Sequence, residues 1–206
     1  MERLFPMYVK LSGHSVLVVG AGKAAESKIE GLLDTGAQIR VVALEATSRV
    51  QNWAKSNVIG FEQRAFVASD LDGIFLVIVA TSSSAVNRAI FRAAESRSIL
   101  CNVVDVPELC DFFYPAVLRR GDLQIAISTA GQSPCLAQSI RQKLEKQFGP
   151  RFGEWVAELG ETRREVLRSH LEPEEKRFLL QSFASRNALE VTVAAKRSPE
   201  SRGEAV

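Results

Sequence analysis

Two stretches of this chain have residue types and spacings suited to chemistry on a substrate beside a bound nucleotide. The stretch VLVVGAGKAAE, residues 16–26, ends an apolar run in two glycines and continues at once in a helical pattern. The later stretch CNVVDVP ends another apolar run in a carboxylate, Asp105. The first is typical of a phosphate-binding turn, and the second places a candidate proton acceptor at the end of a strand.

The glycine turn predicts binding of a dinucleotide. Gly20 can make the tight turn, and Gly22 lets the backbone approach a pyrophosphate without a Cβ in the way. Ala25 replaces the third glycine of the G-x-G-x-x-G pattern and still allows the helix to pack closely. Free N–H groups and the helix dipole favour an anion at this helix start. A second apolar strand over residues 38–44 completes a βαβ unit. This context favours a nucleotide site over the alternative, a strand-to-helix turn whose small residues serve only packing.

An acid that would bind the ribose of NAD is expected about 20 positions after the turn, near the end of the second strand. Val41, Val42 and Ala43 occupy that region, and Glu45 is the first acid beyond it. Glu45 is therefore a candidate ribose contact, with a solvated loop glutamate as the alternative. No arginine follows the strand before Arg49, so a 2′-phosphate has no close partner and the sequence favours NAD over NADP.

Other periodic stretches predict the elements that hold these residues at one crevice. Further strands are expected over residues 7–11, 58–61, 71–80 and 99–104, and helices from Lys23, over 47–57 and over 85–96. In a doubly wound sheet the carboxyl ends of the strands face the cofactor, so Thr81 can line the site. The serines at 82–84 can instead cap the following helix. Asp105 lies at the same edge, where a turn-forming acid is the alternative to a catalytic one.

Beyond Phe113 the parallel α/β order gives way to an antiparallel hairpin and helices. Strand-like runs over 114–118 and 123–129 are joined by RRGD, a glycine-containing hairpin connection. The sequence from Arg151 onward is helical in pattern and rich in charge. The expected fold is therefore α/β, with a Rossmann-type parallel sheet over 1–113, a small α+β dimerisation segment over 114–149, a helical C-terminal segment over 150–195 and a disordered polar tail over 196–206.

The loop STAGQSP, residues 128–134, is a second stretch of small residues at a helix start. Ser133 is the expected N-cap and Pro134 the first residue of a helix that runs to Gln147. This loop is a second anion site in principle. A well-capped helix also explains the serine and the proline by itself.

Composition excludes several classes of protein. The 26 Lys+Arg against 24 Asp+Glu give a net charge of +2. This charge is too small for a protein that binds nucleic acid over a large surface. Cys101, Cys110 and Cys135 form no C-x-x-C pair, and His14 and His170 lie far apart in the sequence, so neither a disulfide framework nor a protein metal site is expected. No apolar stretch approaches about 18 residues and no signal peptide is evident, so we expect a soluble cytoplasmic protein without a membrane partner.

Four of these motifs together resemble the N-terminal module of siroheme synthases, a precorrin-2 dehydrogenase with or without sirohydrochlorin ferrochelatase activity. They are FPMYVKLSGHSVLVVGAGKAAESKIEGLL, ATSSSAVN, CNVVDVP and STAGQSPCLAQSIRQKLE, in this order and at the family's spacing. The resemblance is close over residues 5–148. It implies NAD-dependent oxidation of precorrin-2 to sirohydrochlorin, followed in some members by insertion of ferrous iron, and a homodimer built through the part after the Rossmann domain.

The resemblance assigns residues of these motifs to the cofactor or the substrate. The expected cofactor-binding residues are Gly20, Gly22, Lys23, Ala24, Leu44 and Glu45, which match family motifs, together with Thr81 and Asn102, which are expected from their own strands. The expected substrate-binding residues of the second loop are Thr129, Gly131 and Ser133, and Asp105 matches the family's essential aspartate. The sequence departs from the family pattern in two ways. Ala130 stands where a glycine is frequent. The methyltransferase domain fused in some relatives is absent, so the chain is not expected to make precorrin-2 itself.

The expected reaction needs a hydride acceptor and a base for the proton lost from the ring system. Asp105 can be that base if partial burial raises its pKa. Metal insertion also needs pyrrole nitrogens deprotonated, so the same carboxylate could serve both steps, with the macrocycle receiving the iron. Arg119, Arg120, Arg141 and Lys143 could bind the substrate's carboxylate arms, with solvated surface as the alternative for each.

Two other classes of function stay open. An NAD-binding regulatory module, of the kind that gates a transporter, would show the first motif but need neither Asp105 nor the serine-proline loop. A structural dimerisation protein with a vestigial nucleotide site would tolerate loss of Gly20 or Gly22, and both are intact.

Overall fold

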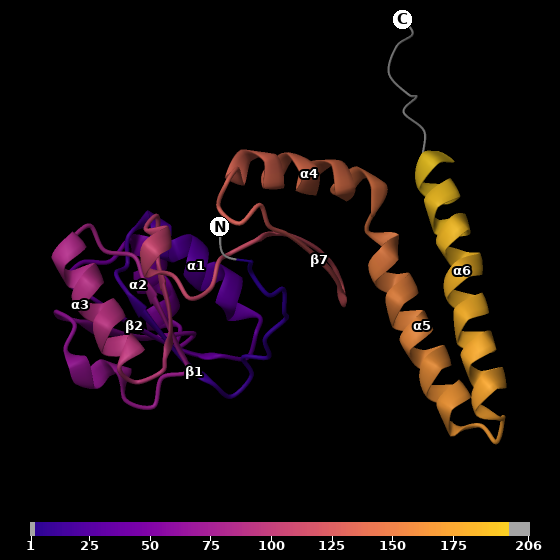
Figure 1. The fold of residues 1–206 in the computed structure, drawn as a ribbon, viewed down its shortest axis with the longest axis horizontal. Helices are drawn as coiled ribbons and strands as arrows, with labels where there is room; N and C mark the ends of the chain where they lie inside the picture. The colour runs from indigo at the N-terminus through magenta and orange to yellow at the C-terminus, as the bar shows by residue number, and fades with distance from the viewer. Residues whose placement is uncertain (1–2, 198–206) are drawn as a thin grey trace, which may run out of the picture. The chain divides into compact units, whose positions relative to one another are not determined.

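The fold consists of two compact units that divide between Phe113 and Tyr114 (Figure 1). It is known from a computed structural model that describes residues 3–197, with side chains described through residue 185. The division falls where the sequence pattern changes from parallel α/β order to a hairpin and helices.

The first unit is built on a parallel sheet of five strands in the order β3-β2-β1-β4-β5. The strands are β1 (Ser15–Val19), β2 (Gln38–Ala43), β3 (Gly60–Gln63), β4 (Leu76–Val79) and β5 (Leu100–Val103). Val19 pairs with Val42 on one side and Val79 on the other, and Val79 pairs with Val103. Successive strands are therefore added on one side of β1 up to β3 and on its other side from β4 onward. The carboxyl ends of β1, β2, β4 and β5 lie side by side, at the edge where such sheets bind their ligands.

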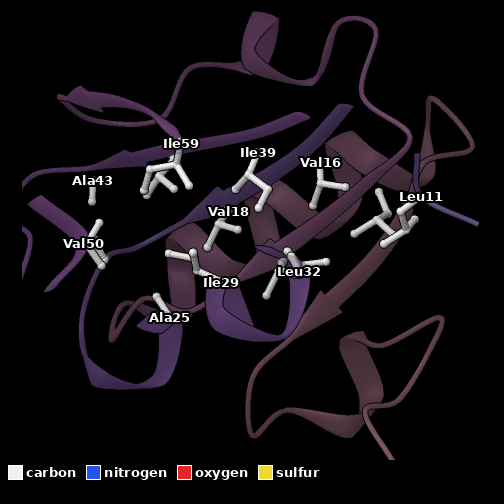
Figure 2. Close-up of a cluster of buried hydrophobic side chains, with 14 residues drawn as sticks. Leu11, Val16, Val18, Ala25, Ile29, Leu32, Ile39, Ala43, Val50 and Ile59 are labelled. Carbon is white, nitrogen blue, oxygen red and sulfur yellow. The ribbon is translucent and has the colours of Figure 1, made fainter. Parts of the chain in front are cut away.

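Helices cover both faces of this sheet, as the apolar character of its strands predicts. They are α1 (Lys23–Leu33), α2 (Ser48–Lys55) and α3 (Ser84–Glu95), with short 3-10 helices η1 (Ala68–Leu71) and η2 (Pro107–Leu109). Val16 and Val18 pack into one cluster with α1 and α2, shown in Figure 2, and Leu17 and Val19 pack into a second cluster with α3. Alternate residues of β1 thus enter opposite cores, which explains the uninterrupted apolar run.

Two expected strands differ most from the structure, while those expected over 58–61, 114–118 and 123–129 are present with bounds shifted or shortened by two residues. The described residues 3–11 hold no strand, and Phe5, Met7 and Tyr8 are exposed. An apolar stretch becomes a strand only where a neighbouring strand completes its hydrogen bonds, and the sequence pattern does not report that neighbour. The run over 71–80 yields only the four residues of β4, because Gly73, with φ of 73°, first makes a turn in which the Ile74 N–H donates to the Leu71 carbonyl.

The second unit begins with an antiparallel hairpin of β6 (Ala116–Arg120) and β7 (Leu123–Ile127). Helices α4 (Pro134–Gln147) and α5 (Arg151–Arg168) pack against this hairpin, and α6 (Pro173–Arg197) lies beside α5 (Figure 1). Gly153 lets α5 approach the hairpin turn, since a Cβ there would lie 3.1 Å from the backbone nitrogen of Gly121. Helix α4 has the predicted bounds, with Ser133 as N-cap and Pro134 first.

The end of the chain differs slightly from expectation. Helix α6 continues to Arg197, so the first two residues of the expected disordered tail are helical. The rest of that tail, residues 198–206, lies outside the described residues. Over the described part of the chain, no helix is both long and apolar enough to cross a membrane.

Candidate functional site

The glycine turn between β1 and α1 has two glycines with different tasks. Gly20 has φ of 104°, and a Cβ there would lie 2.3 Å from the carbonyl oxygen of Ala80, the residue after β4. Gly22 has an ordinary φ of −82°, and a Cβ there would meet nothing within 4 Å. Gly20 is therefore required by the fold, whereas the space beside Gly22 is open for a ligand.

The start of α1 fits an anionic group. Gly22 is the N-cap and offers no side chain to the helix, whose first backbone bond runs from the Glu26 N–H to the Gly22 carbonyl. The N–H groups of Lys23 and Ala24 precede that bond, and both residues are exposed. The Lys23 ammonium lies 3.3 Å from Glu26 Oε2. The residues present thus fit the pyrophosphate of a dinucleotide.

Glu26 is a buried carboxylate at this turn that sequence reasoning missed. It is 6% exposed, and the hydrogen bond from the Thr47 side chain, together with Lys23, holds the pKa of Glu26 below its usual value. The Thr47 N–H donates to the Ala21 carbonyl at 3.1 Å, so the segment after β2 is tied to the turn twice. Leu44 on that segment is 68% exposed, which leaves the adenosine side accessible. The only sequence signal was an acid directly after the glycine pattern.

Arg49, the first arginine after β2, already has partners in the protein. Its guanidinium donates to the Glu30 carboxylate of α1 and lies 4.9 Å from the ring centre of Trp53. Glu45 is exposed in the loop before it. This arrangement gives Arg49 a structural role and agrees with the preference for NAD.

Thr81 and Asn102 lie at or just below the carboxyl edge, where their side chains bond to the protein itself. The Thr81 hydroxyl donates to Asn87 Oδ1 at 2.6 Å, at the start of α3. The Asn102 amide is buried and donates to the Phe112 carbonyl at 2.7 Å. Both side chains thus help to fix the local structure at this edge of the sheet.

Asp105 stands on a turn directly beyond β5, with a backbone φ of 61°. The turn is closed by the Val106 N–H, which donates to the Val103 carbonyl at 3.2 Å, and by the Cys110 thiol, which donates to the same carbonyl at 3.2 Å. Asp105 is exposed in this chain, so the partial burial set as a condition for its role as a base is not seen here. It lies two residues past Val103, the last buried residue of the strand.

The cysteines of the first unit are structural. Burial raises the pKa of Cys101 to about 12 and raises that of Cys110 as well. Both thiols are therefore protonated near neutral pH and are poor nucleophiles. Among the side chains that the structure describes, no cluster of three or more His, Cys, Asp or Glu could hold a metal ion.

The serine-rich loop before α4 lies in the second unit and is held by its own side chains. The Thr129 hydroxyl accepts from the Ser133 N–H at 3.0 Å, and the Ser128 hydroxyl accepts from the Ala130 N–H at 3.1 Å. Ala130 and Gly131 have φ of 50° and 80°. The alanine thus occupies a left-handed position, which explains why a glycine is frequent there.

The four basic residues named as possible substrate contacts differ in their partners within the protein. Arg120 donates to the Phe148 carbonyl at 2.8 Å, and Arg141 pairs with Glu145. Arg119 on β6 and Lys143 on α4 are exposed. Arg119 and Lys143 are thus better placed to bind an anionic substrate.

Two protein families match successive parts of the chain. Residues 7–116 match the family described as "Putative NAD(P)-binding", and residues 120–147 match the family described as "Sirohaem biosynthesis protein central". A solved structure described as SirC, precorrin-2 dehydrogenase, is similar with a TM-score of 0.78 and 28% identity, covering 94% of this chain and 96% of that one. These matches confirm the expected α/β fold with a Rossmann-type sheet and the resemblance stated from the motifs.

Several curated relatives carry the name siroheme synthase. That of Neisseria meningitidis serogroup C is 38% identical over 186 residues, which are 89% of this chain and 38% of the relative. Siroheme synthase 1 of Yersinia enterocolitica is 39% identical over 185 residues, 89% of this chain and 39% of the relative. That of Methylococcus capsulatus is 34% identical over 197 residues, which are 96% of this chain and 42% of the relative. The chain spans about two fifths of the length of these relatives.

Proposed function

We propose that this chain, which belongs to the NAD(P)-binding family matched by residues 7–116, oxidises precorrin-2 to sirohydrochlorin with NAD. The observation that carries the proposal is the edge of the parallel sheet. An open glycine turn that fits a pyrophosphate and the carboxylate of Asp105 follow strands of one sheet. The similarity of almost the whole chain to a precorrin-2 dehydrogenase supports the same reaction.

In this proposal the glycine turn holds the cofactor. The N–H groups at the start of α1, from Lys23 and Ala24, would bind the pyrophosphate, and Leu44 with Glu45 would lie on the adenosine side. NAD supplies a hydride acceptor when it is bound. Glu26 and Thr47 keep the turn and the adenosine-side segment together, so these two residues act on binding without touching the cofactor.

Asp105 would take the proton that leaves the substrate as the hydride is lost. The oxidation removes one hydride and one proton from the reduced macrocycle, so a single carboxylate is enough for the acid–base part. Because Asp105 is exposed in the chain alone, it can return the proton to water between turnovers. In the second unit, the loop with Thr129, Gly131 and Ser133 and the exposed Arg119 would bind the carboxylate arms.

Insertion of ferrous iron into sirohydrochlorin is the second activity that we propose for the same site. It is favoured by the match of residues 120–147 to a sirohaem biosynthesis family. The iron enters as a substrate and is received by the macrocycle's nitrogens. Asp105 would again accept protons, now from those nitrogens. The reactants and the enzyme would meet in the cytoplasm, as the sequence predicts.

A single experiment separates these functions. The purified chain is incubated with precorrin-2 and NAD and the absorption spectrum is followed, after which ferrous iron is added. We expect the spectrum of sirohydrochlorin to develop only with NAD, and that of siroheme to develop only after iron. Tight NAD binding without any spectral change would instead favour the regulatory module.

A further inference from the structure

The segment directly after β2 is fixed beside the glycine turn by hydrogen bonds of its backbone. The Thr47 N–H donates to the Ala21 carbonyl at 3.1 Å, and the Leu44 carbonyl accepts from Gln63 Nε2 at 3.1 Å. The side chains of Leu44 and Glu45 are exposed. In dinucleotide-binding folds an acid at this place binds the ribose of NAD, or an arginine binds the 2′-phosphate of NADP. The segment is therefore where the site distinguishes the two cofactors.

Arg49 is the cation nearest in sequence to this segment. It is the second residue of α2, and its Cα lies within about 7 Å of that of Thr47 because only two residues separate them. Its guanidinium has the paired donors that bind a phosphate well. These donors are directed elsewhere, since Arg49 donates to the Glu30 carboxylate and its Cζ lies 4.9 Å from the ring centre of Trp53.

Glu30 holds Arg49 from the neighbouring helix. Val50, next to Arg49, and Ile29, next to Glu30, belong to one cluster of buried side chains that joins α1 and α2 (Figure 2). Above this cluster the side chains of Glu30 and Arg49 remain 54% and 49% exposed. An ion pair so exposed adds little to stability. Its clearer effect is on position, because the pair and the ring of Trp53 together fix where the guanidinium lies.

We propose that Glu30 is a specificity-determining residue: its carboxylate holds the Arg49 guanidinium away from the 2′-position of the adenosine ribose, so that the site selects NAD over NADP. The proposal rests on the proposed function in one respect, namely that the glycine turn binds the dinucleotide. The ribose of NAD meets Glu45, whereas the 2′-phosphate of NADP meets the same carboxylate with no free cation to offset it. NADP binds well only when Arg49 leaves Glu30 and Trp53.

Calorimetry with NAD and NADP on the purified chain tests this selection without any turnover. Glu30→Ala frees Arg49, so we expect the affinity for NADP to rise roughly fivefold, the upper end of what an exposed ion pair is worth, and the affinity for NAD to stay unchanged. The gain should shrink as salt is added, because it comes from a contact between exposed charges. The double variant Glu30→Ala/Arg49→Met should return to the parent affinity for NADP.

Asp34→Ala is the matched control, because it removes the same charge from another exposed acid at the end of α1. Both affinities should stay at their parent values in this variant. A gain for NADP below about twofold in Glu30→Ala would overturn the proposal. An equal gain for both cofactors, or a gain that persists in the double variant, would overturn it as well. Glu30→Gln replaces Glu30→Ala if circular dichroism shows that the latter does not fold.

The test separates this selection from the proposed reaction. If the affinities change as expected but precorrin-2 is never oxidised, the proposed function fails and the role of Glu30 stands. If precorrin-2 is oxidised with NAD but Glu30→Ala gains nothing toward NADP, the proposed function stands and the role of Glu30 is overturned. If the parent chain binds neither dinucleotide, the glycine turn is not the cofactor site, and both proposals fail.

Discussion

At the residue scale, single backbone positions decide which side chains the site can tolerate. Gly20 and Asp105 both have positive φ, but only Gly20 also lies against another strand. Gly22 has neither restriction. Substitutions at these three positions therefore separate effects on the fold from effects on the ligand.

We predict that Gly22→Asp folds normally but loses NAD binding, because its side chain enters open space that the pyrophosphate would fill and adds a negative charge there. Gly20→Ala, by contrast, should unfold the first unit, since its Cβ would lie 2.3 Å from the Ala80 carbonyl oxygen. Calorimetry with NAD and circular dichroism on both variants check the pair. Tight NAD binding by Gly22→Asp would remove the turn as the cofactor site. Tighter binding of NADP than of NAD by the parent protein would contradict the preference.

We predict that Asp105→Asn keeps the fold and the affinity for NAD but loses about 10²–10⁴ in turnover, the usual value of a general base. Asparagine tolerates the left-handed backbone as aspartate does, so it removes the charge alone. Asp105→Ala adds backbone strain of about 1 kcal/mol, so it changes the stability of the turn as well as the charge. Steady-state rates with precorrin-2 decide the matter. Near-parental activity of Asp105→Asn would leave this residue only a turn-forming role.

At the element scale, polar contacts fix the connections between strands and helices. Asp70 in η1 is 3% exposed and accepts hydrogen bonds from Arg64 Nη1 at 2.8 Å, Arg64 Nη2 at 2.6 Å and the Val67 N–H at 2.9 Å. These bonds, with Arg64 first, hold the pKa of Asp70 below its ordinary value. They join the end of β3 to η1 and thus to the connection that leads into β4.

We predict that Asp70→Asn destabilises the first unit by about 1–3 kcal/mol at neutral pH. Since the folded pKa of Asp70 lies below the unfolded one, this stability is fully present above about pH 4 and is lost as the pH falls through the folded value. Urea unfolding at neutral and acidic pH checks this. Trp155→Phe in both proteins leaves Trp53 as the only tryptophan and reports the first unit alone. An equal difference at both pH values would contradict the prediction.

We also predict that Gly153→Leu destabilises the second unit by about 1–3 kcal/mol, because a side chain would push α5 from the hairpin. A Cβ at this position would already lie 3.1 Å from Gly121 N. Gly160→Ala in the same helix is the matched control, since its Cβ would meet only the flexible Arg164 side chain at 3.5 Å, and it should gain about 1 kcal/mol. Thermal unfolding followed through Trp155 measures both. Equal melting temperatures would show that this contact is unimportant.

At the scale of the whole molecule, the second unit carries several large apolar side chains on its surface. Its exposed apolar side chains include Leu136, Leu167, Leu171, Phe178 and Phe183, and Phe178 is 71% exposed. A two-stranded hairpin is marginal by itself, so a further protein surface would stabilise the unit. These features support the homodimer that we propose from the resemblance.

We predict a dimer mass by light scattering at micromolar concentration. Phe178→Asp should shift the mass toward the monomer if the surface of α6 takes part, whereas Phe5→Asp, on the exposed N-terminal segment of the first unit, should leave it unchanged. A monomer mass for the parent protein would contradict the dimer. A dimer insensitive to Phe178→Asp but broken by Phe5→Asp would place the interface on the first unit.

The sequence by itself determined the features that depend on neighbouring residues. The apolar run before Gly20 predicts a strand buried on both faces, and Ser133 with Pro134 predicts the start of α4, because caps and strand burial act within a few residues. Asp105 was found at the end of a strand for the same reason. The resemblance of the four motifs then supplied a reaction that no single motif specifies.

Only the tertiary structure decided what depends on residues far apart in the chain. Glu26 meets Thr47 across the first crossover, although the two residues lie on different elements. The absence of a strand over residues 3–11 likewise depends on what lies beside that stretch. Burial and charge pairing are set by the packing of whole elements, and this packing is not written in the local pattern of either partner.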